Sequence, residues 1–277
     1  MSGIIGTGTE SSKGSTKLDR LKGLIASYGS VLVAFSGGLD STFLVKVAHD
    51  VLGDSAVAFT IVSPLVPSME REEAARLART IGVRQIVKRL NPLQDPVMLS
   101  NPRDRCFHCK LNLYSEGLKT AAEHNLAVFM DGTTAEDTES DRPGLRAIKE
   151  LGIRTPLADA GFTREEVRFY SRELGLPTWN KPSQSCLATR IPYGDKLDES
   201  TLLRLDQCER SLWELGFSQV RARLHGKILR IEVPVEEMGK FGDADLRKRL
   251  VARCRELGFK YITVDLEGFE SGSMDRE

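Results

Sequence analysis

The stretch VLVAFSGGLDST, residues 31–42, decides the fold. Its first five residues, Val31 to Phe35, form a short continuous apolar run, which is typical of a strand buried on both faces. A polar turn with two glycines follows, and apolar positions at helical spacing then extend from Thr42 to Leu52. A buried strand, a glycine-containing turn and a helix in this order predict the beginning of a βαβ unit.

Strand and helix signals continue to alternate through the first half of the chain. Short apolar runs predict strands, and apolar positions at helical spacing predict helices, in the order helix 18–25, strand 56–62, helix 70–81, strand 85–90, helix 107–124 and strand 127–130. Strands that alternate with helices of this length predict an α/β fold with a mostly parallel sheet.

The pattern becomes less regular in the middle of the chain. Residues 131–142 (DGTTAEDTESDR) are polar and acidic, and we interpret them as an active-site loop that Pro143-Gly144 ends with a turn. Thr163 to Glu166 is a capping box for a helix that ends near Leu174. The irregular stretch 175–195 is long for a connection inside a domain, and such stretches tend to be functional or disordered.

The last part of the chain predicts a small α+β unit. Its expected elements are a helix at 197–215, a hairpin of 220–224 and 228–233 with Gly226 in the turn, a helix that Asp243 caps and that runs to Leu257, and a strand at 261–266. We therefore expect a disordered leader at 1–16, an α/β domain at 17–195 and an α+β domain at 196–277 for substrate binding or oligomerisation.

Composition limits the function classes. Lys plus Arg and Asp plus Glu both number 39, so the formal net charge is zero, which argues against a protein that mainly binds nucleic-acid backbone. No apolar run approaches the roughly 20 residues that span a bilayer, and the N-terminus does not have the pattern of a signal peptide. We expect a cytoplasmic protein with a small anionic substrate.

The turn at 36–42 has the features of a phosphate-binding loop. Its glycines allow the backbone to approach phosphates, and the helix that follows presents unpaired N–H groups with a favourable dipole. It lacks the Gly-Lys-Ser/Thr ending of a Walker A loop, and its glycine spacing is not that of a dinucleotide fingerprint. The sequence therefore predicts a phosphate-binding site at Ser36, Gly37, Gly38, Asp40, Ser41 and Thr42.

The five cysteines are odd in number and do not suggest a disulfide framework. Cys106 and Cys109 lie three residues apart at the start of a predicted helix, where both can face one ion, and Cys186 in the irregular stretch is a third candidate ligand. Three cysteines on a 4Fe–4S cluster would leave one iron open to carry sulfide. A zinc site, three unrelated thiols, or direct attack by the Cys186 thiolate remain open; Cys208 and Cys254 are interpreted as small core residues.

The loop at residues 36–42 resembles the PP-loop, S-G-G-x-D-S, of the N-type ATP pyrophosphatases. This resemblance implies a Rossmann-like fold of the adenine nucleotide alpha-hydrolase type, ATP and Mg²⁺ as the ligands of the loop, and an adenylated intermediate. Over residues 17–274 the chain resembles the LarE family, sulfur transferases of nickel-pincer nucleotide synthesis. The resemblance is carried by SGGLDST (36–42), DGTTAEDTESDRPGLRA (131–147), WNKPSQSCLATRIPYG (179–194) and VRARLHGKILRIE (220–232).

The resemblance implies the substrate and the residue roles. The family adenylates two carboxylates of a pyridinium mononucleotide and replaces AMP with sulfur. In some members the sulfur comes from one sacrificial cysteine, and Cys186 matches that position. In other members three cysteines bind a 4Fe–4S cluster that relays sulfide. Cys106, Cys109 and Cys186 match those three cysteines, so we favour the cluster for this chain. The resemblance also implies a homo-oligomer, a hexamer, and an external sulfide donor. It assigns nucleotide binding to Ser63 and Gly132, and acids near the sulfur site to Glu209 and Glu232. Catalysis is assigned to Asp40, Cys186, Arg221 and Arg223, and substrate contacts to Thr189, Arg190, Arg221 and Arg223.

Other functions predict different behaviour. A tRNA thiolase of the same superfamily would bind bulk tRNA at low salt, although no RNA-binding extension is recognisable. An ammonia-using synthetase would not need Cys106, Cys109 and Cys186 together. A non-catalytic nucleotide-binding regulator would release no pyrophosphate from ATP and Mg²⁺.

Overall fold

The computed structural model describes residues 10–138 and 142–275 of the chain. It divides into two compact units. The first contains Met1–Val62, Glu70–Leu90 and Cys106–Ser183, and the second contains Ser63–Met69, Asn91–Arg105 and Gln184–Glu277. Among the described helices, none combines the length and the apolar character needed to cross a bilayer.

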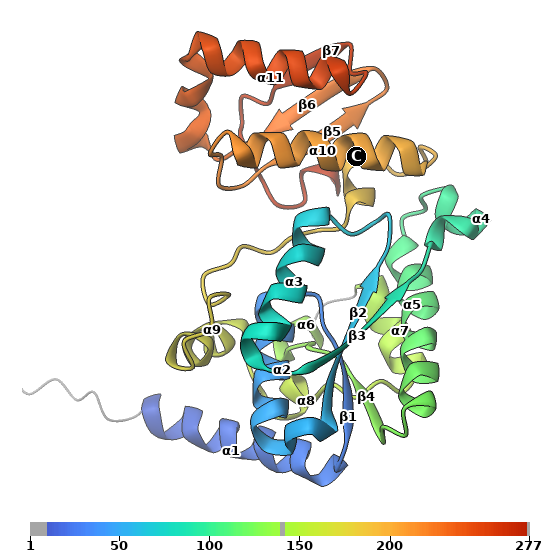
Figure 1. The fold of residues 1–277 in the computed structure, drawn as a ribbon, viewed down its shortest axis with the longest axis vertical. Helices are drawn as coiled ribbons and strands as arrows, with labels where there is room; N and C mark the ends of the chain where they lie inside the picture. Colours follow the sequence, from blue (N-terminus) through green and yellow to red (C-terminus); the bar gives the residue numbers. More distant parts are fainter. Residues whose placement is uncertain (1–9, 139–141, 276–277) are drawn as a thin grey trace, which may run out of the picture. The chain divides into compact units, whose positions relative to one another are not determined.

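The first unit is built on a four-stranded sheet in which every pair is parallel (Figure 1). The order is β3-β2-β1-β4, with β1 at Val31–Ala34, β2 at Ala56–Val62, β3 at Arg84–Arg89 and β4 at Val128–Met130. The chain passes from β1 to β2 and on to β3 on one side, and then crosses back over the sheet to β4 on the other side of β1. The carboxyl end of β1 is therefore the topological switch point at which such sheets bind ligands.

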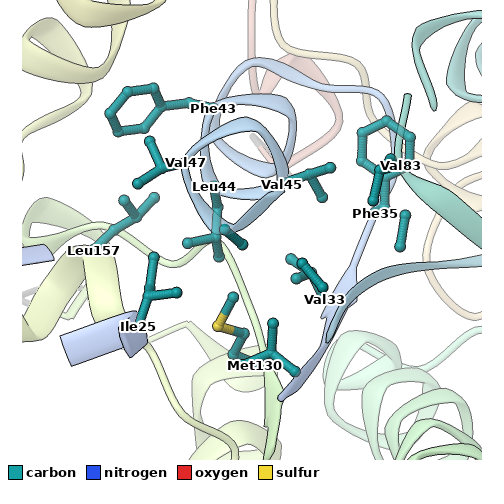
Figure 2. Close-up of a cluster of buried hydrophobic side chains, with 14 of the residues drawn as sticks. Ile25, Val33, Phe35, Phe43, Leu44, Val45, Val47, Val83, Met130 and Leu157 are labelled. Carbon is teal, nitrogen blue, oxygen red and sulfur yellow. The ribbon is translucent and has the colours of Figure 1, made fainter. Parts of the chain in front are cut away.

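Both faces of this sheet are covered, as the apolar run at β1 predicts. Val31 and Val33 point into the larger core, shown in Figure 2, while Leu32 between them points into a second core on the other face. The larger core takes residues from α1 (Glu10–Tyr28), α2 (Leu39–Leu52), α3 (Ser68–Ile81), α8 (Pro156–Asp159) and α9 (Arg164–Glu173). The second takes residues from α5 (Arg105–Glu123) and α7 (Pro143–Glu150).

The second unit contains a three-stranded sheet in the order β5-β6-β7. Strands β5 and β6 form an antiparallel hairpin, and β7 pairs with β6 in parallel. Three α-helices of this unit, α4, α10 and α11, begin with N-caps from the side chains of Asp95, Asp198 and Asp243. The bounds are β5 Arg221–His225, β6 Ile228–Glu232, β7 Tyr261–Val264, α4 Pro96–Leu99, α10 Glu199–Glu214 and α11 Ala244–Glu256.

Cys208 on α10 and Cys254 on α11 have no exposed surface, and their sulfur atoms lie 3.5 Å apart. Their interpretation as small core residues is confirmed. The α/β fold class, with its parallel sheet and smaller α+β part, is confirmed as well.

Several local expectations differ from the structure. Pro143-Gly144 opens α7 rather than a turn, because proline at the first helical position has the required φ and lacks only an N–H that would stay unpaired. The acidic loop contains the short helix α6, Ala135–Thr138, and its residues 139–141 lie outside the described part. Of the expected leader, residues 1–9 are also outside it, whereas 10–16 belong to α1. The division between the units falls at Ser183 instead of Asp195 and places two earlier segments in the second unit.

Candidate active site

The predicted phosphate loop lies at the carboxyl end of β1 and is shaped by its own hydroxyl groups. The Oγ atoms of Ser36 and Ser41 are 3.2 Å apart, and the Ser41 hydroxyl donates to the carbonyl oxygen of Gly38 at 3.3 Å. Gly38 is the N-cap of α2 and offers no side-chain oxygen to the first-turn N–H groups. Those donors are free of side-chain capping, as an anion site at a helix N-terminus requires.

Two glycines make this compact arrangement sterically possible. Gly37 has a φ of 73°, and a Cβ there would lie 3.0 Å from the Cα of Ala74 on α3. Gly132, just beyond β4, packs against the start of α2, where a Cβ would lie 3.1 Å from the backbone nitrogen of Ser41. The structure therefore brings Gly132 to the loop, although the two are distant in sequence, because β1 and β4 are neighbours.

Asp40, in the first turn of α2, carries an unusual charge environment. Burial raises the pKa of this carboxyl to about 6, against the opposing effect of the Arg164 guanidinium, whose Nε lies 3.9 Å from Oδ2. Within the described part of the chain, Oδ1 of Asp40 and Oγ1 of Thr42 are buried without a hydrogen-bond partner. A buried carboxylate oxygen and a hydroxyl oxygen that await a partner fit a hard cation such as Mg²⁺.

The segment after β4 adds a second acidic group to the same unit. Asp131 accepts hydrogen bonds from the Thr133 backbone, the Thr133 hydroxyl and the Tyr114 hydroxyl. The ammonium group of Lys110 lies 3.9 Å from it. Burial, together with the Asp131 charge, raises the pKa of Tyr114 well above its usual range, so this phenol remains a donor.

Asp137 is the centre of a further ion-pair cluster beside Asp40. It accepts from the Thr134 backbone at 3.1 Å and from Arg142 and Arg164 at 3.1 and 3.0 Å. Arg164 thus connects the acidic segment with the phosphate loop. Sequence reasoning found neither Tyr114 nor Arg164, since each acts on the site from a helix with an ordinary amphipathic pattern.

The cysteines that sequence reasoning grouped together belong to different units. Cys106 is exposed and Cys109 is half-buried, and both lie near the start of α5. The Cβ atom of Cys106 lies 3.9 Å from where a Cβ of Gly144 would be. Cys186 is half-buried in the second unit. Across the described residues there is no group of three or more His, Cys, Asp or Glu side chains that could hold a metal ion. The cluster therefore stays a prediction.

Cys186 lies at the start of a short 3₁₀ helix, Leu187–Arg190, whose position is fixed by Arg190. This arginine has no exposed surface, and its Nη1 donates to the carbonyl oxygens of Ser185 and Cys186 at 3.0 and 3.1 Å. Its Nε and Nη2 form a bidentate pair with Glu209 at 2.8 and 2.9 Å. Each guanidinium nitrogen is thus engaged within the protein, so Arg190 positions the Cys186 segment in this structure.

The two acids that the resemblance places near the sulfur site, Glu209 and Glu232, are both buried in the second unit. Glu209 is 5% exposed and also accepts from the backbone of Ala222 on β5, so it links α10, β5 and the Cys186 segment. Glu232 has no exposed surface and accepts from Arg223 and Arg230 at 2.6 and 2.9 Å. Neither is a surface residue.

Arg221 and Arg223 project from the same face of β5, as their alternation predicts, and both are buried. Arg223 also donates to the carbonyl oxygen of Thr189 at 2.9 Å, while the Arg221 guanidinium lies over the Phe269 ring at 4.9 Å. Burial and the nearby cation of Arg190 lower the pKa of Arg221 to about 10. An anion at this place would relieve the repulsion among the three guanidinium groups.

Two remaining predicted residues have local contacts. The Thr189 hydroxyl donates to the Cys186 carbonyl oxygen at 2.8 Å, so it stabilises the short turn that begins at Cys186. Ser63, after β2, is buried and accepts from the Leu65 backbone at 3.0 Å, and it belongs to the second unit. The first unit thus holds the predicted phosphate loop with Gly132, and the second holds Cys186 with the arginines.

A parallel sheet with a glycine loop and a half-buried aspartate at its switch point is typical of a PP-loop protein of the ATP pyrophosphatase type. Relatives of this chain fit that class. A pyridinium-3,5-bisthiocarboxylic acid mononucleotide synthase from Lactiplantibacillus plantarum is 37% identical over 94% of this chain and 94% of its own. One chain of a glutamine-hydrolyzing GMP synthase from Sulfurisphaera tokodaii is 24% identical over 54% of this chain and 44% of its own.

An uncharacterized protein from Synechocystis sp. is 40% identical over 94% of this chain and 97% of its own. No protein-family model matches the chain. The chain belongs to the LarE family, that of the Lactiplantibacillus synthase, because the identity extends over nearly the whole of both chains.

Proposed function

We propose that this protein is an ATP-dependent sulfur transferase that converts the carboxylates of pyridinium-3,5-biscarboxylic acid mononucleotide to thiocarboxylates in nickel-pincer nucleotide synthesis. The observation that carries the proposal is the similarity to the Lactiplantibacillus synthase over 94% of both chains, which includes both units. The GMP synthase chain matches only 54% of this chain at 24% identity, so the longer and stronger match to the mononucleotide synthase favours the mononucleotide substrate.

In the first step, a carboxylate oxygen of the substrate attacks the α-phosphorus of ATP, and pyrophosphate leaves. The first-turn N–H groups of α2 and the hydroxyls of Ser36 and Ser41 are suited to bind the departing phosphates. Asp40 and Thr42 would hold Mg²⁺, which supplies positive charge that offsets the charge of the phosphates. The adenylate then carries AMP as a good leaving group.

In the second step, a sulfur nucleophile displaces AMP from the acyl carbon. If Cys186 is that nucleophile, its thiolate forms a thioester with the substrate. Removal of the Cys186 Cα proton and cleavage of its Cβ–S bond then release the thiocarboxylate and leave dehydroalanine. The contacts of Arg190 and Thr189 with the Cys186 carbonyl would hold this segment in place during both bond changes.

Cys106 and Cys109 favour the alternative source of sulfur. Their i, i+3 spacing near the start of α5 places both on one side of the helix, and together with Cys186 they would hold a 4Fe–4S cluster. Such a cluster would supply an open iron that binds exogenous sulfide. Iron and acid-labile sulfide in protein reconstituted without oxygen, compared with Cys106→Ala and Cys208→Ala, test this choice. Loss of iron only in Cys106→Ala supports the cluster, and full iron in both variants refutes it.

Buried Arg221 and Arg223 support a site for the phosphate and carboxylate of the mononucleotide, because paired guanidinium groups bind such anions bidentately.

The whole proposal is tested by pyrophosphate release. Wild-type protein with ATP, Mg²⁺ and the dicarboxylate mononucleotide is expected to release it, and Asp40→Ala is not. Asp54→Ala, at an exposed carboxylate beyond the same helix, is the matched control. Release that is equal in all three proteins would refute the role of the loop.

A further inference from the structure

A cationic side chain from outside the phosphate loop reaches the loop backbone. Lys181 lies in the irregular segment after α9, and its Nζ donates to the carbonyl oxygen of Gly37 at 3.0 Å. The same nitrogen lies 3.0 Å from a carboxylate oxygen of Glu70 in the first turn of α3. The side chains of Lys181 and Glu70 are each 17% exposed, so the pair is partly shielded from water.

The loop itself brings no positive side chain to the phosphates. Its residues 36–42 contain one charged group, the carboxylate of Asp40. A triphosphate carries several negative charges, and a helix N-terminus is equivalent to only about half a positive charge. A nearby ammonium group therefore contributes to an anion site of this kind, as the lysine of a Walker A loop does from within the loop.

The chemistry of Lys181 allows it to bind a ligand without leaving the loop. An ammonium group has three N–H donors, and two of them are accounted for by Gly37 and Glu70. The third is available to an acceptor, and the flexible four-carbon stem permits small movements of the group. Arg164 also approaches the loop, at 3.9 Å from Asp40, but its Nη2 is bound to Asp137 at 3.0 Å.

We propose that Lys181 is a pyrophosphate-binding residue whose ammonium group binds an oxygen of the terminal phosphates of ATP, with Glu70 as its counter-ion before the ligand arrives. This inference rests on the proposed ATP site at residues 36–42. It assigns the segment between α9 and Ser183 a direct part in ligand binding. Glu70 then limits affinity, since its carboxylate competes with the phosphates for the same ammonium group.

The test is calorimetric binding of inorganic pyrophosphate with Mg²⁺, and of AMP, to the full chain. Lys181→Met is expected to weaken pyrophosphate binding by about tenfold to a hundredfold, the usual effect of a charged hydrogen bond. AMP, which lacks the terminal phosphates, is expected to bind as it does to wild type. Lys181→Arg keeps the charge and is expected to bind pyrophosphate more tightly than Lys181→Met.

Glu70→Gln separates ligand binding from a purely structural anchor. If Lys181 binds pyrophosphate, removal of the competing carboxylate leaves the affinity unchanged or raises it. If the Lys181–Glu70 pair only maintains the conformation of the loop, Glu70→Gln weakens pyrophosphate binding, and that result overturns the proposal. The Glu70→Gln variant therefore tests the proposal even if Lys181→Met does not fold. Pyrophosphate binding that is unchanged in Lys181→Met also overturns the proposal for Lys181. It leaves the ATP site at residues 36–42 in place, because the wild-type protein still binds pyrophosphate. Wild-type protein that binds neither ATP nor pyrophosphate would refute the proposed function as well.

Discussion

Replacement of Asp40 with asparagine is expected to stabilise the protein while it removes adenylation. The carboxyl of Asp40 has its pKa raised from 3.8 to about 6 by burial. The folded protein therefore holds this proton more tightly than the unfolded chain does. As pH rises through 3.8 and up to 6, the free energy of unfolding decreases, and above that range the full penalty of about 3 kcal/mol persists.

Asparagine does not titrate, so Asp40→Asn is free of this penalty. We compare the free energy of unfolding of Asp40→Asn with that of wild type at two pH values. The advantage of the variant is expected to be larger near pH 7.5 than near pH 5, by about 1.4 kcal/mol. Urea unfolding at the two pH values measures it, with Asp54→Asn as the control at an exposed position. Effects of the asparagine amide that do not depend on pH are the same at both pH values, so they cancel in this comparison.

The same variant connects stability with function. Mg²⁺ and ATP are expected to raise the unfolding midpoint of wild type but not of Asp40→Asn, because the variant lacks the carboxylate that would hold the ion. Wild-type binding of Mg²⁺ with pyrophosphate is expected to weaken below pH 6, where Asp40 takes up its proton. A stability difference that is the same near both pH values would refute the charge environment assigned to Asp40.

Three further variants test other parts of the site. Arg190→Met is expected to destabilise the protein by about 3–5 kcal/mol in urea unfolding, because it leaves Glu209 buried without its bidentate partner; an unchanged midpoint would contradict this. Gly132→Ala is expected to weaken ATP binding at least about tenfold in calorimetry, since its Cβ would lie 3.1 Å from the Ser41 nitrogen; wild-type affinity would show that the loop adapts. Arg221→Met is expected to raise the KM for the mononucleotide while adenosine binding stays unchanged, and an equal effect on both would refute an anion-specific role.

The first unit could be predicted largely from local sequence signals. The run at 31–35 has apolar residues on both strand faces, and these enter the two cores that cover the sheet. The capping box of Thr163 and Glu166 and the N-cap at Asp243 occur as predicted, because such caps depend on residues only a few positions apart. Short helices that start with proline, such as α7, were missed because proline also begins turns.

The candidate site was less predictable where it depends on distant contacts. The burial of Arg190 and Glu209, 19 positions apart, follows from the packing of α10 against β5, and a single sequence does not encode that contact locally. Lys181 and Tyr114 gave no signal, since lysine and tyrosine at such positions are usually solvated or part of a core. The loop was found because strand, glycines and helix are contiguous in sequence.

The central claim is that sulfur replaces oxygen in a carboxylate after adenylation. Its most direct test is mass spectrometry of the small molecules and of the protein after incubation with ATP, Mg²⁺, the dicarboxylate mononucleotide and sulfide. We expect a thiocarboxylate product together with AMP and pyrophosphate, and a protein mass that is unchanged for sulfide relay or reduced by one H₂S for donation from Cys186. Unchanged mononucleotide, or a product that contains amide nitrogen instead of sulfur, would contradict sulfur transfer.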